Sequence, residues 1–385
     1  PVVKYGTTVG LASQDIAPGE HVHIHNVEGI KGRGDKVQAP PSERSTEQAR
    51  VRALSQTRPV SIVRSTDEPL GAEPIADTFL GYPRADGSVG IRNHILVFPT
   101  VVCAATVAQM ISRAVPGTVS VSHPHGCGHL GADWEHMLRA MTGFCTNPNV
   151  GGVLLVGLGC EQVTTDVLAA RLQDAGQRFE VMHMQDEGGT SGAVATGREL
   201  AQALLRTTAT DRRIPVDISR LTVGMKCGGS DTLSGLTANP AAGVTADLLV
   251  AAGGTVIITE VPEMIGAEDV LASRAGDEEV RERIYEVVDD MERSILATGV
   301  DVRGSEPSPG NMEGGLTTLE EKSLGAIRKG GSSPVRQVTA YAERPREKGL
   351  IVMDGPALDA VSVTCLLYTS PSPRDRTRSR MPSSA

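Results

Sequence analysis

The sequence predicts an α/β protein in which a small β-rich N-terminal domain precedes two doubly wound α/β halves with mainly parallel sheets. Two observations support this fold class. From residue 79 onward, short apolar stretches alternate with helical stretches of about 10–15 residues, which is the pattern of parallel strands joined by crossover helices. The chain also has 43 glycines and only 3% aromatic residues, which suits many tight turns between strands and helices.

The N-terminal part shows β-type alternation. Val2–Tyr5 and Val22–His25 alternate as half-buried strands do, and a turn is expected at Ala17–Glu20 between them. Residues 36–75 are polar and contain several prolines, as a partly disordered linker does. Residues 1–70 are therefore predicted to form the β domain and the linker.

The first α/β half is assigned to residues 71–215. Ile95–Phe98 is a continuous apolar run, as in a strand that is covered on both faces. The other expected strands are 118–121, 152–157 and 179–183, and the expected helices are 104–115, 133–144, 161–175 and 189–206.

The second half is assigned to residues 216–364. Its expected strands are 221–224, 255–258 and 350–353, its expected helices are 241–252 and 277–297, and residues 304–315 are expected to form a loop.

The tail, residues 365–385, differs from the rest of the chain because it is dense in Ser, Pro and Arg and interrupts an apolar segment. We interpret it as non-native sequence joined to a truncated reading frame. The alternative is a disordered basic tail. On the first interpretation its arginines are not a nucleic-acid patch.

Charge and composition exclude several classes of partner. The net charge of −9 argues against a nucleic-acid partner, so an anionic substrate would need a local group of cations, metal or backbone amides. No apolar run is long enough to cross a bilayer, and the N-terminus, Pro1–Lys4, shows no charged-then-apolar secretion signal. The chain begins without Met, which favours a fragment of a longer protein. The six cysteines are widely spread, which argues against a disulfide framework and favours a reducing, cytoplasmic compartment.

Two histidine-rich segments are the strongest candidates for chemistry. On a strand, His21, His23 and His25 would share one face and could bind metal or transfer protons; the alternative is a solvated surface. Residues 122–129 carry three histidines and Cys127 in a glycine-containing loop after a strand, where open α/β sheets bind ligands. Imidazole and thiolate suit Fe, Zn or Mn, and the alternative is a structural turn.

Two further strand ends carry a cysteine beside glycine. Gly157–Glu161 places Cys160 and Glu161 after a strand, and Lys226–Asp231 adds Lys226 and Cys227 before a helix whose N-terminus favours anions. Each segment alone could be a plain turn and helix cap.

Charged residues occur at two other strand ends. In residues 81–93, Arg84 and Arg92 could bind a carboxylate as a fork, unless the segment is only a hairpin leading into the first strand. Glu260 and Glu263 could be acid/base groups or metal ligands. A phosphate loop, a nucleophile elbow and paired CxxC motifs are not found, and a nicotinamide site is not expected.

These segments resemble the altronate/galactarate dehydratase family over roughly residues 8–364. The resemblance lies in GYPRADGSVGIRN (81–93), HPHGCGH (123–129), GLGCE (157–161), KCGGSDTLSGLTANPAAG (226–243), PSPGNMEGG (307–315) and MDGP (353–356). Residues 19–26 resemble the family's N-terminal SAF domain. Family members continue beyond residue 356 with more α/β structure, which the tail replaces here.

The resemblance implies a hydro-lyase that converts a sugar acid, altronate first, to a 2-keto-3-deoxy acid by metal-assisted β-elimination with Fe²⁺ or Mn²⁺. The expected partner is the small sugar acid. Neither nucleic acid nor a membrane is expected as a partner, and assembly into a homo-oligomer is one option. The expected catalytic residues are His23, His25, Glu161 and Lys226. The expected substrate-binding residues are Arg84, Arg92, Asn93, Ser230 and Asp231. The expected metal ligands are His125, Cys127, Cys160 and Cys227.

Three alternatives remain. Cys127, Cys160 and Cys227 could hold an Fe–S cluster with one open iron, which also dehydrates hydroxy acids. The substrate could be galactarate, or sulfolactate in a sulfo-lyase-like elimination. The chain could instead bind a sugar acid without turning it over.

Overall fold

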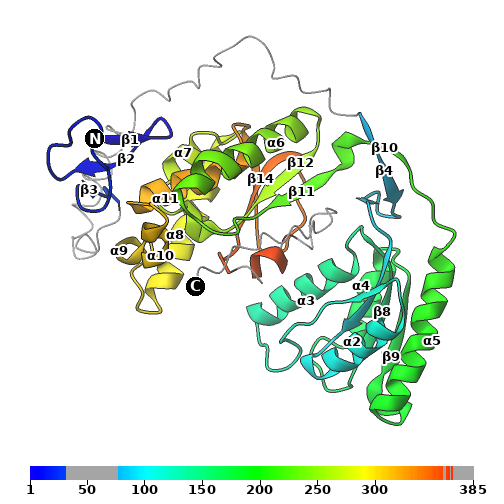
Figure 1. Cartoon of the computed structure of the whole chain (residues 1–385). Helices are drawn as coiled ribbons and strands as arrows, with labels where there is room; N and C mark the ends of the chain where they lie inside the picture. The colour runs from blue at the N-terminus through cyan, green and yellow to red at the C-terminus, as the bar shows by residue number, and fades with distance from the viewer. Residues whose placement is uncertain (32–76, 359–360, 365, 367–385) are drawn as a thin grey trace. The chain divides into compact units, whose positions relative to one another are not determined.

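The computed structural model describes residues 1–31, 77–358, 361–364 and 366 (Figure 1). Contacts divide them into two compact units. The first unit combines the described parts of Pro1–Asp77 with Met225–Leu366, and the second unit contains Thr78–Gly224. The predicted linker over 36–75 lies wholly outside the described residues, as does the tail except for Leu366.

The second unit contains a four-stranded parallel sheet of strand order β7-β6-β8-β9. Its strands are β6 His94–Pro99, β7 Thr118–Ser120, β8 Val150–Gly157 and β9 Phe179–His183, and its helices are α2 Ala105–Ala114, α3 Ala132–Cys145, α4 Thr165–Asp174 and α5 Thr190–Thr208. Short 3-10 helices span Val102–Ala104, Met184–Glu187 and Ile218–Arg220.

Helices cover both faces of this sheet. Ile95, Val97, Leu154 and Val156 face a buried core shared with α2 and α5. Phe98, whose side chain points to the opposite face by strand alternation, packs on Phe144 of α3 with ring centroids 5.9 Å apart. The predicted doubly wound α/β fold is therefore confirmed.

An antiparallel ribbon outside the predicted elements adjoins this sheet. It consists of β4 Thr78–Pro83, β5 Val89–Gly90 and β10 Ile214–Asp217, in the order β10-β4-β5. Gly90 is required there because a Cβ atom would lie 1.9 Å from the carbonyl oxygen of Pro148.

The first unit contains a second four-stranded sheet, of order β11-β12-β14-β13, in which β12 and β13 both run parallel to β14. Its strands are β11 Thr222–Met225, β12 Thr255–Ile258, β13 Val335–Thr339 and β14 Gly349–Met353. Its helices are α6 Asn239–Ala251, α7 Glu268–Ala272, α8 Glu278–Leu296, α9 Val302–Ser305, α10 Pro309–Glu313 and α11 Leu319–Ile327, with shorter turns at Ser234–Ala238, Val261–Met264 and Arg328–Gly330. The segment 304–315 was expected to be a loop, but it holds the whole of α10 and the last two residues of α9. Helix α10 begins there because Ser308 caps it and Pro309 occupies its first position.

The N-terminal strands belong to the first unit. β1 Val2–Lys4, β2 Thr7–Ala12 and β3 Val27–Glu28 form an antiparallel sheet. The Thr318 hydroxyl donates to the carbonyl oxygen of Val9 at 2.6 Å, and Lys4 pairs with the buried Glu321. The small β domain is therefore tied to α11.

Candidate active site

The loop after β11 is open on one side. It runs from Lys226 to Asp231, and a Cβ atom added at Gly228 or Gly229 would meet no atom within 4 Å. Across the described residues, the backbone amides of Gly228, Gly229 and Ser230 donate to no protein acceptor. Consecutive amides of this kind can bind an anion.

Four charged side chains gather next to this loop. Lys329 Nζ donates to Glu260 Oε2 at 2.7 Å and to Glu263 Oε2 at 3.1 Å, and Lys226 Nζ lies 3.4 Å from Glu260 Oε1. The side chains of Glu260 and Lys329 are only 1% and 3% exposed. Burial would lower the pKa of Lys329, but Glu263 and Glu260 outweigh it and raise that pKa. The two ammonium groups thus neutralise the two carboxylates, as buried charges require.

Glu260 also holds the backbone at Cys227. Its carboxylate accepts from the Cys227 amide at 2.7 Å, and its own φ of 74° lies in the left-handed region, which is costly for a residue with a side chain. Burial and the charge of Glu263 raise the pKa of Cys227, so its thiol is favoured over the thiolate.

A loop from α10 closes over the same segment. Asn311 Nδ2 donates to the carbonyl oxygen of Ser230 at 2.9 Å, and the Thr232 amide donates to the Gly314 carbonyl at 3.1 Å. His23 Nε2 lies 3.1 Å from the Met312 carbonyl oxygen. Because a carbonyl only accepts, Nε2 carries the hydrogen, and a neutral His23 keeps its lone pair on Nδ1. Asp231 caps the following turn by accepting from the Ser234 amide at 2.6 Å.

The histidine segment is a turn, so the prediction of a strand over 22–25 was wrong. Asn26 is fully buried; it accepts from the His23 amide at 2.9 Å and donates to the His21 carbonyl at 3.0 Å. Such side-chain bonds to the backbone compete with strand pairing. The rings still gather: the centroid of His21 lies 5.2 Å from that of His23 and 6.1 Å from that of His25.

In the second unit, Glu161 organises the turn at the carboxyl end of β8. Its carboxylate accepts from the Thr100 hydroxyl at 2.7 Å, from the Gly159 amide at 2.6 Å and from the Leu158 amide at 3.3 Å. Burial opposes ionisation, but these hydrogen bonds outweigh it and lower the pKa of Glu161. The carboxylate is therefore charged and already occupied by donors.

The loop after β7 brings three imidazoles to the same edge of the sheet. His123 Nε2 lies 2.7 Å from the Pro99 carbonyl oxygen. Ring centroids of His123 and His125 are 6.0 Å apart, and those of His125 and His129 are 5.1 Å apart. Burial lowers the pKa of His123 and His125, and the neighbouring His129 adds to the effect on both. These two rings are therefore favoured in the neutral form that binds metals.

Exposed thiols meet at this edge as well. Partial desolvation and the neighbouring thiols of Cys160 and Cys103 raise the pKa of Cys127. The loops are joined because the Gln162 amide donates to the Gly126 carbonyl at 3.0 Å. Cys127 and Cys160, predicted as metal ligands, are therefore neighbours.

The described residues do not complete a metal site by themselves. No group of three or more His, Cys, Asp or Glu side chains within them is arranged to hold a metal ion. Cys227, the fourth expected ligand, belongs to the first unit, whereas His125, Cys127 and Cys160 belong to the second. Fe²⁺ or Mn²⁺ binding stays a prediction.

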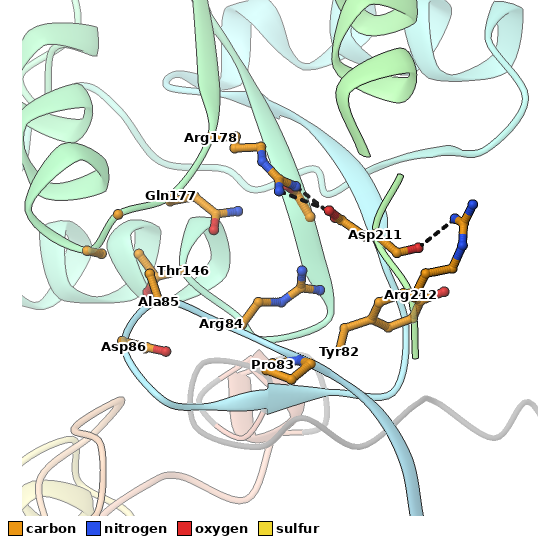
Figure 2. A pocket seen from close by; sticks show the side chains of 13 residues that line it. Tyr82, Pro83, Arg84, Ala85, Asp86, Thr146, Gln177, Arg178, Asp211 and Arg212 are labelled. Carbon is orange, nitrogen blue, oxygen red and sulfur yellow. Dashed lines mark hydrogen bonds and ion pairs between the residues drawn. The ribbon is translucent and has the colours of Figure 1, made fainter. Parts of the chain in front are cut away.

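The predicted substrate-binding residues Arg84 and Asn93 lie elsewhere. Asn93 immediately precedes β6, so it marks the amino edge of the sheet, opposite to the cysteines and histidines. Arg84 donates to Asn93 Oδ1 at 2.8 Å, to the Pro148 carbonyl at 2.7 Å and to the Arg92 carbonyl at 3.0 Å. Figure 2 shows Arg84 in a pocket with Arg178 and Asp211. We call it the Arg84 pocket; it has a volume of about 220 Å³ and is lined by Tyr82–Asp86, Thr146, Gly151, Ala175–Arg178, Asp211 and Arg212.

The structure therefore sorts the predicted residues into three places. One is the glycine loop of the first unit, with Lys226, Cys227, Ser230, Asp231 and the histidine turn. The second is the carboxyl edge in the second unit, with His125, Cys127, Cys160 and Glu161. The third is the amino edge of that same sheet, with Arg84, Arg92 and Asn93.

Sequence reasoning missed Lys329, Thr100 and Cys103 as partners of these groups. Lys329 sits in the ordinary segment Arg-Lys-Gly-Gly, where nothing distinguishes a buried lysine from an exposed one. Cys103 follows the end of β6 by four residues, and its place after a buried strand was the available indication.

Comparison with known proteins assigns each part of the chain to one family. Residues 1–29 match the altronate/galactarate dehydratase SAF domain, residues 81–209 the second domain of D-galactarate dehydratase/altronate hydrolase, and residues 218–369 the D-galactarate/altronate dehydratase C-terminal domain.

Individual relatives agree with these matches. The chain is 36% identical over 376 residues to altronate dehydratase of Bacillus subtilis (strain 168), covering 95% of this chain and 70% of that protein. It is 35% identical over 378 residues to altronate dehydratase of Escherichia coli (strain K12), with the same coverage of 95% and 70%. It is 36% identical over 289 residues to (2R)-sulfolactate sulfo-lyase subunit beta of Chromohalobacter salexigens, covering 74% of each. The chain therefore belongs to the altronate/galactarate dehydratase family, a family of sugar-acid hydro-lyases and related lyases.

Proposed function

We propose that this protein dehydrates altronate to a 2-keto-3-deoxy acid, and that the substrate carboxylate binds at the glycine loop after β11. The observation that carries the proposal is the run of unused amides at Gly228, Gly229 and Ser230 beside Lys226, over open space. A carboxylate needs such donors in a chain of net charge −9.

The reaction removes the proton at C2 and expels the hydroxyl at C3. The C2–H electron pair forms the C2=C3 bond, and the 3-hydroxyl leaves as water after it gains a proton. The resulting enol then becomes the 2-ketone. Negative charge grows on the substrate carboxylate as the C2 proton leaves, so amides and an ammonium group aimed at that carboxylate stabilise the transition state.

His23 is the proposed base. Its Nε2 is committed to the Met312 carbonyl at 3.1 Å, so Nδ1 is the atom that accepts the C2 proton. The α10 loop that holds His23 also contacts Ser230 through Asn311, which links the base to the proposed carboxylate site. His25 is the second candidate in the same turn. Glu161 is proposed to order its turn, because its oxygens already accept three amide or hydroxyl hydrogens.

The variants that test these roles are His23→Gln and Lys226→Met. We expect His23→Gln to lower kcat by about 10²–10⁴-fold, the range for losing a general base, and Lys226→Met to raise KM for the sugar acid as well. His21→Gln is the matched control, since His21 stacks on His23 without bonding to Met312. Equal kcat values for His23→Gln and His21→Gln would rule out His23 as the base.

The activity itself is tested by anaerobic assay with Fe²⁺ or Mn²⁺, on this chain and on a chimera extended with the C-terminal segment of the Bacillus relative. Altronate, galactarate and sulfolactate are offered, and 2-keto acid or sulfite is detected. We expect keto acid from altronate and its loss after chelation of the metal. An iron–sulfur cluster, the alternative cofactor, would instead give a broad visible absorption band.

A sulfo-lyase activity is the second candidate, because the sulfolactate relative matches 74% of this chain. It begins with the same proton removal but expels sulfite. Product formation from sulfolactate alone would favour it, and binding of sugar acids without product from any of the three would indicate a non-catalytic protein.

A further inference from the structure

We propose that the Arg84 pocket is a binding site for a small oxyanion, either an organic carboxylate or inorganic phosphate. It is distinct from the carboxylate site at the glycine loop and does not rest on the proposed function.

The first argument is the donor capacity of Arg84. A guanidinium has five N–H donors, and Arg84 uses three of them, on the carbonyls of Pro148 and Arg92 and on Asn93 Oδ1. These neutral acceptors fix the side chain without cancelling its charge. Figure 2 shows the guanidinium directed into the pocket. A fixed guanidinium with unused N–H groups is well suited to an oxyanion.

The second argument is the charge of the lining. Asp211 is already engaged: it accepts from Arg178 at 2.7 and 2.9 Å and from Asn93 Nδ2 at 3.0 Å. Arg212 donates to the carbonyl oxygens of Ala209 and Asp211 at 2.8 and 3.1 Å. Three arginines therefore line the pocket against two aspartates, Asp86 and Asp211, which leaves one positive charge.

The third argument is room and position. The volume of about 220 Å³ is below the usual range of roughly 300–1,000 Å³ for drug-sized ligands, so it suits a small anion. The pocket adjoins Gly151 at the start of β8, whereas Cys160 and Glu161 follow the end of that strand. A ligand in the pocket therefore cannot contact that edge.

The test is isothermal titration of the full chain with inorganic phosphate and with D-gluconate, at low and high salt. Two charge variants change the pocket at exposed positions: Arg212→Glu, and Ala85→Glu, whose side chain lines the rim. Arg198→Glu is the matched control, since it makes the same charge change at an exposed position of α5 outside the pocket. Lys226→Met separates the pocket from the glycine loop.

In the Lys226→Met background, which lacks the ammonium group beside the glycine loop, we expect binding of at least one probe. That binding should weaken about tenfold or more with Arg212→Glu and with Ala85→Glu, and should change less than twofold with Arg198→Glu. Affinity should also fall with salt. Phosphate binding alone would identify a phosphate-type ligand, and gluconate binding alone a carboxylate. The proposal is overturned if neither probe binds, or if both pocket variants behave as Arg198→Glu does. Loss of binding in Lys226→Met alone would place the anion at the glycine loop and overturn it as well.

Discussion

Buried charges decide what each candidate residue can do. Glu263 and Glu260 raise the pKa of Lys329. Lys329 therefore stays an ammonium group that neutralises these carboxylates, and it does not act as a base. Its partner Glu260 holds the Cys227 amide. This group of side chains therefore supports the glycine loop, while the amides of Gly228, Gly229 and Ser230 donate to no acceptor in the described residues.

Glu161 gives a prediction about acid stability. Its pKa is lowered in the folded protein, so its contribution to stability is fully present above its unfolded pKa of about 4.3 and is lost as pH falls through the lower folded value. Glu161→Gln should therefore reduce the free energy of unfolding near neutral pH and flatten its fall below about pH 4.3. Urea unfolding at several pH values measures this. Glu180→Gln, an exposed position on β9, is the control, and identical pH curves for Glu161→Gln and the wild type would contradict the prediction.

For single residues, the sequence predicted which side chains lie at the carboxyl edge of the sheet, but it did not predict their hydrogen-bond and ion-pair partners. Cysteines and histidines after apolar strands predicted Cys127, Cys160 and His125 at one sheet edge, because parallel strands end together. The place of Arg84 at the other edge could not be predicted, because it depends on how β4 pairs with β10. In that pairing Leu80 lies opposite Pro215, 135 positions later in the chain.

Among the elements, α6 shows how close packing depends on one missing side chain. A Cβ atom at Gly243 would lie 2.2 Å from the Arg328 carbonyl oxygen and 3.1 Å from the Gly331 backbone. The 3-10 turn that carries Lys329 therefore lies directly against the helix.

Gly243→Ala should destabilise the protein by about 1–3 kcal/mol through overpacking, although alanine is the better helix former by about 1 kcal/mol. Gly310→Ala is the control, because a Cβ atom there meets nothing within 4 Å. Thermal and urea unfolding measure both. A Gly243→Ala protein as stable as the wild type would show that α6 can move away from the turn.

Regular elements were largely predictable, and irregular ones were not. Strands such as β6 and β8, and helices such as α5 and α8, follow from unbroken apolar runs and helical periods. The histidine turn was mistaken for a strand because alternation of Val22 and Ile24 with histidine imitates one, while the decisive hydrogen bonds come from Asn26. The same limit applies to α10, which is five residues long.

For the whole molecule, the two units differ in whether they are formed by one continuous segment of the chain or by two separate segments. The second unit is continuous over 78–224, whereas the first combines the N-terminal strands with residues after 225. No helix in the described segments is long and apolar enough to cross a membrane.

This difference predicts the behaviour of fragments. Residues 78–224 alone should unfold cooperatively, because their sheet and both helical layers are complete. Residues 222–366 alone, which keep the whole of β11, should be less stable than the same residues in the full chain, since they lose the bonds of Thr318 to Val9 and of Lys4 to Glu321. Circular dichroism melting and amide NMR dispersion test both. A fragment 78–224 without a cooperative transition would contradict the independence of the second unit.

The hydrogen bond between Val9 and Thr318 can form only long after Val9 has been synthesised. These residues are 309 positions apart, so at about 5–20 residues per second a ribosome needs roughly 15–60 s between them. During that interval the second unit is synthesised and can form its core. Strands β1–β3 meanwhile lack their contacts with Thr318 and Glu321. The nascent chain therefore exposes unpaired strand edges of the small β domain until α11 has been synthesised.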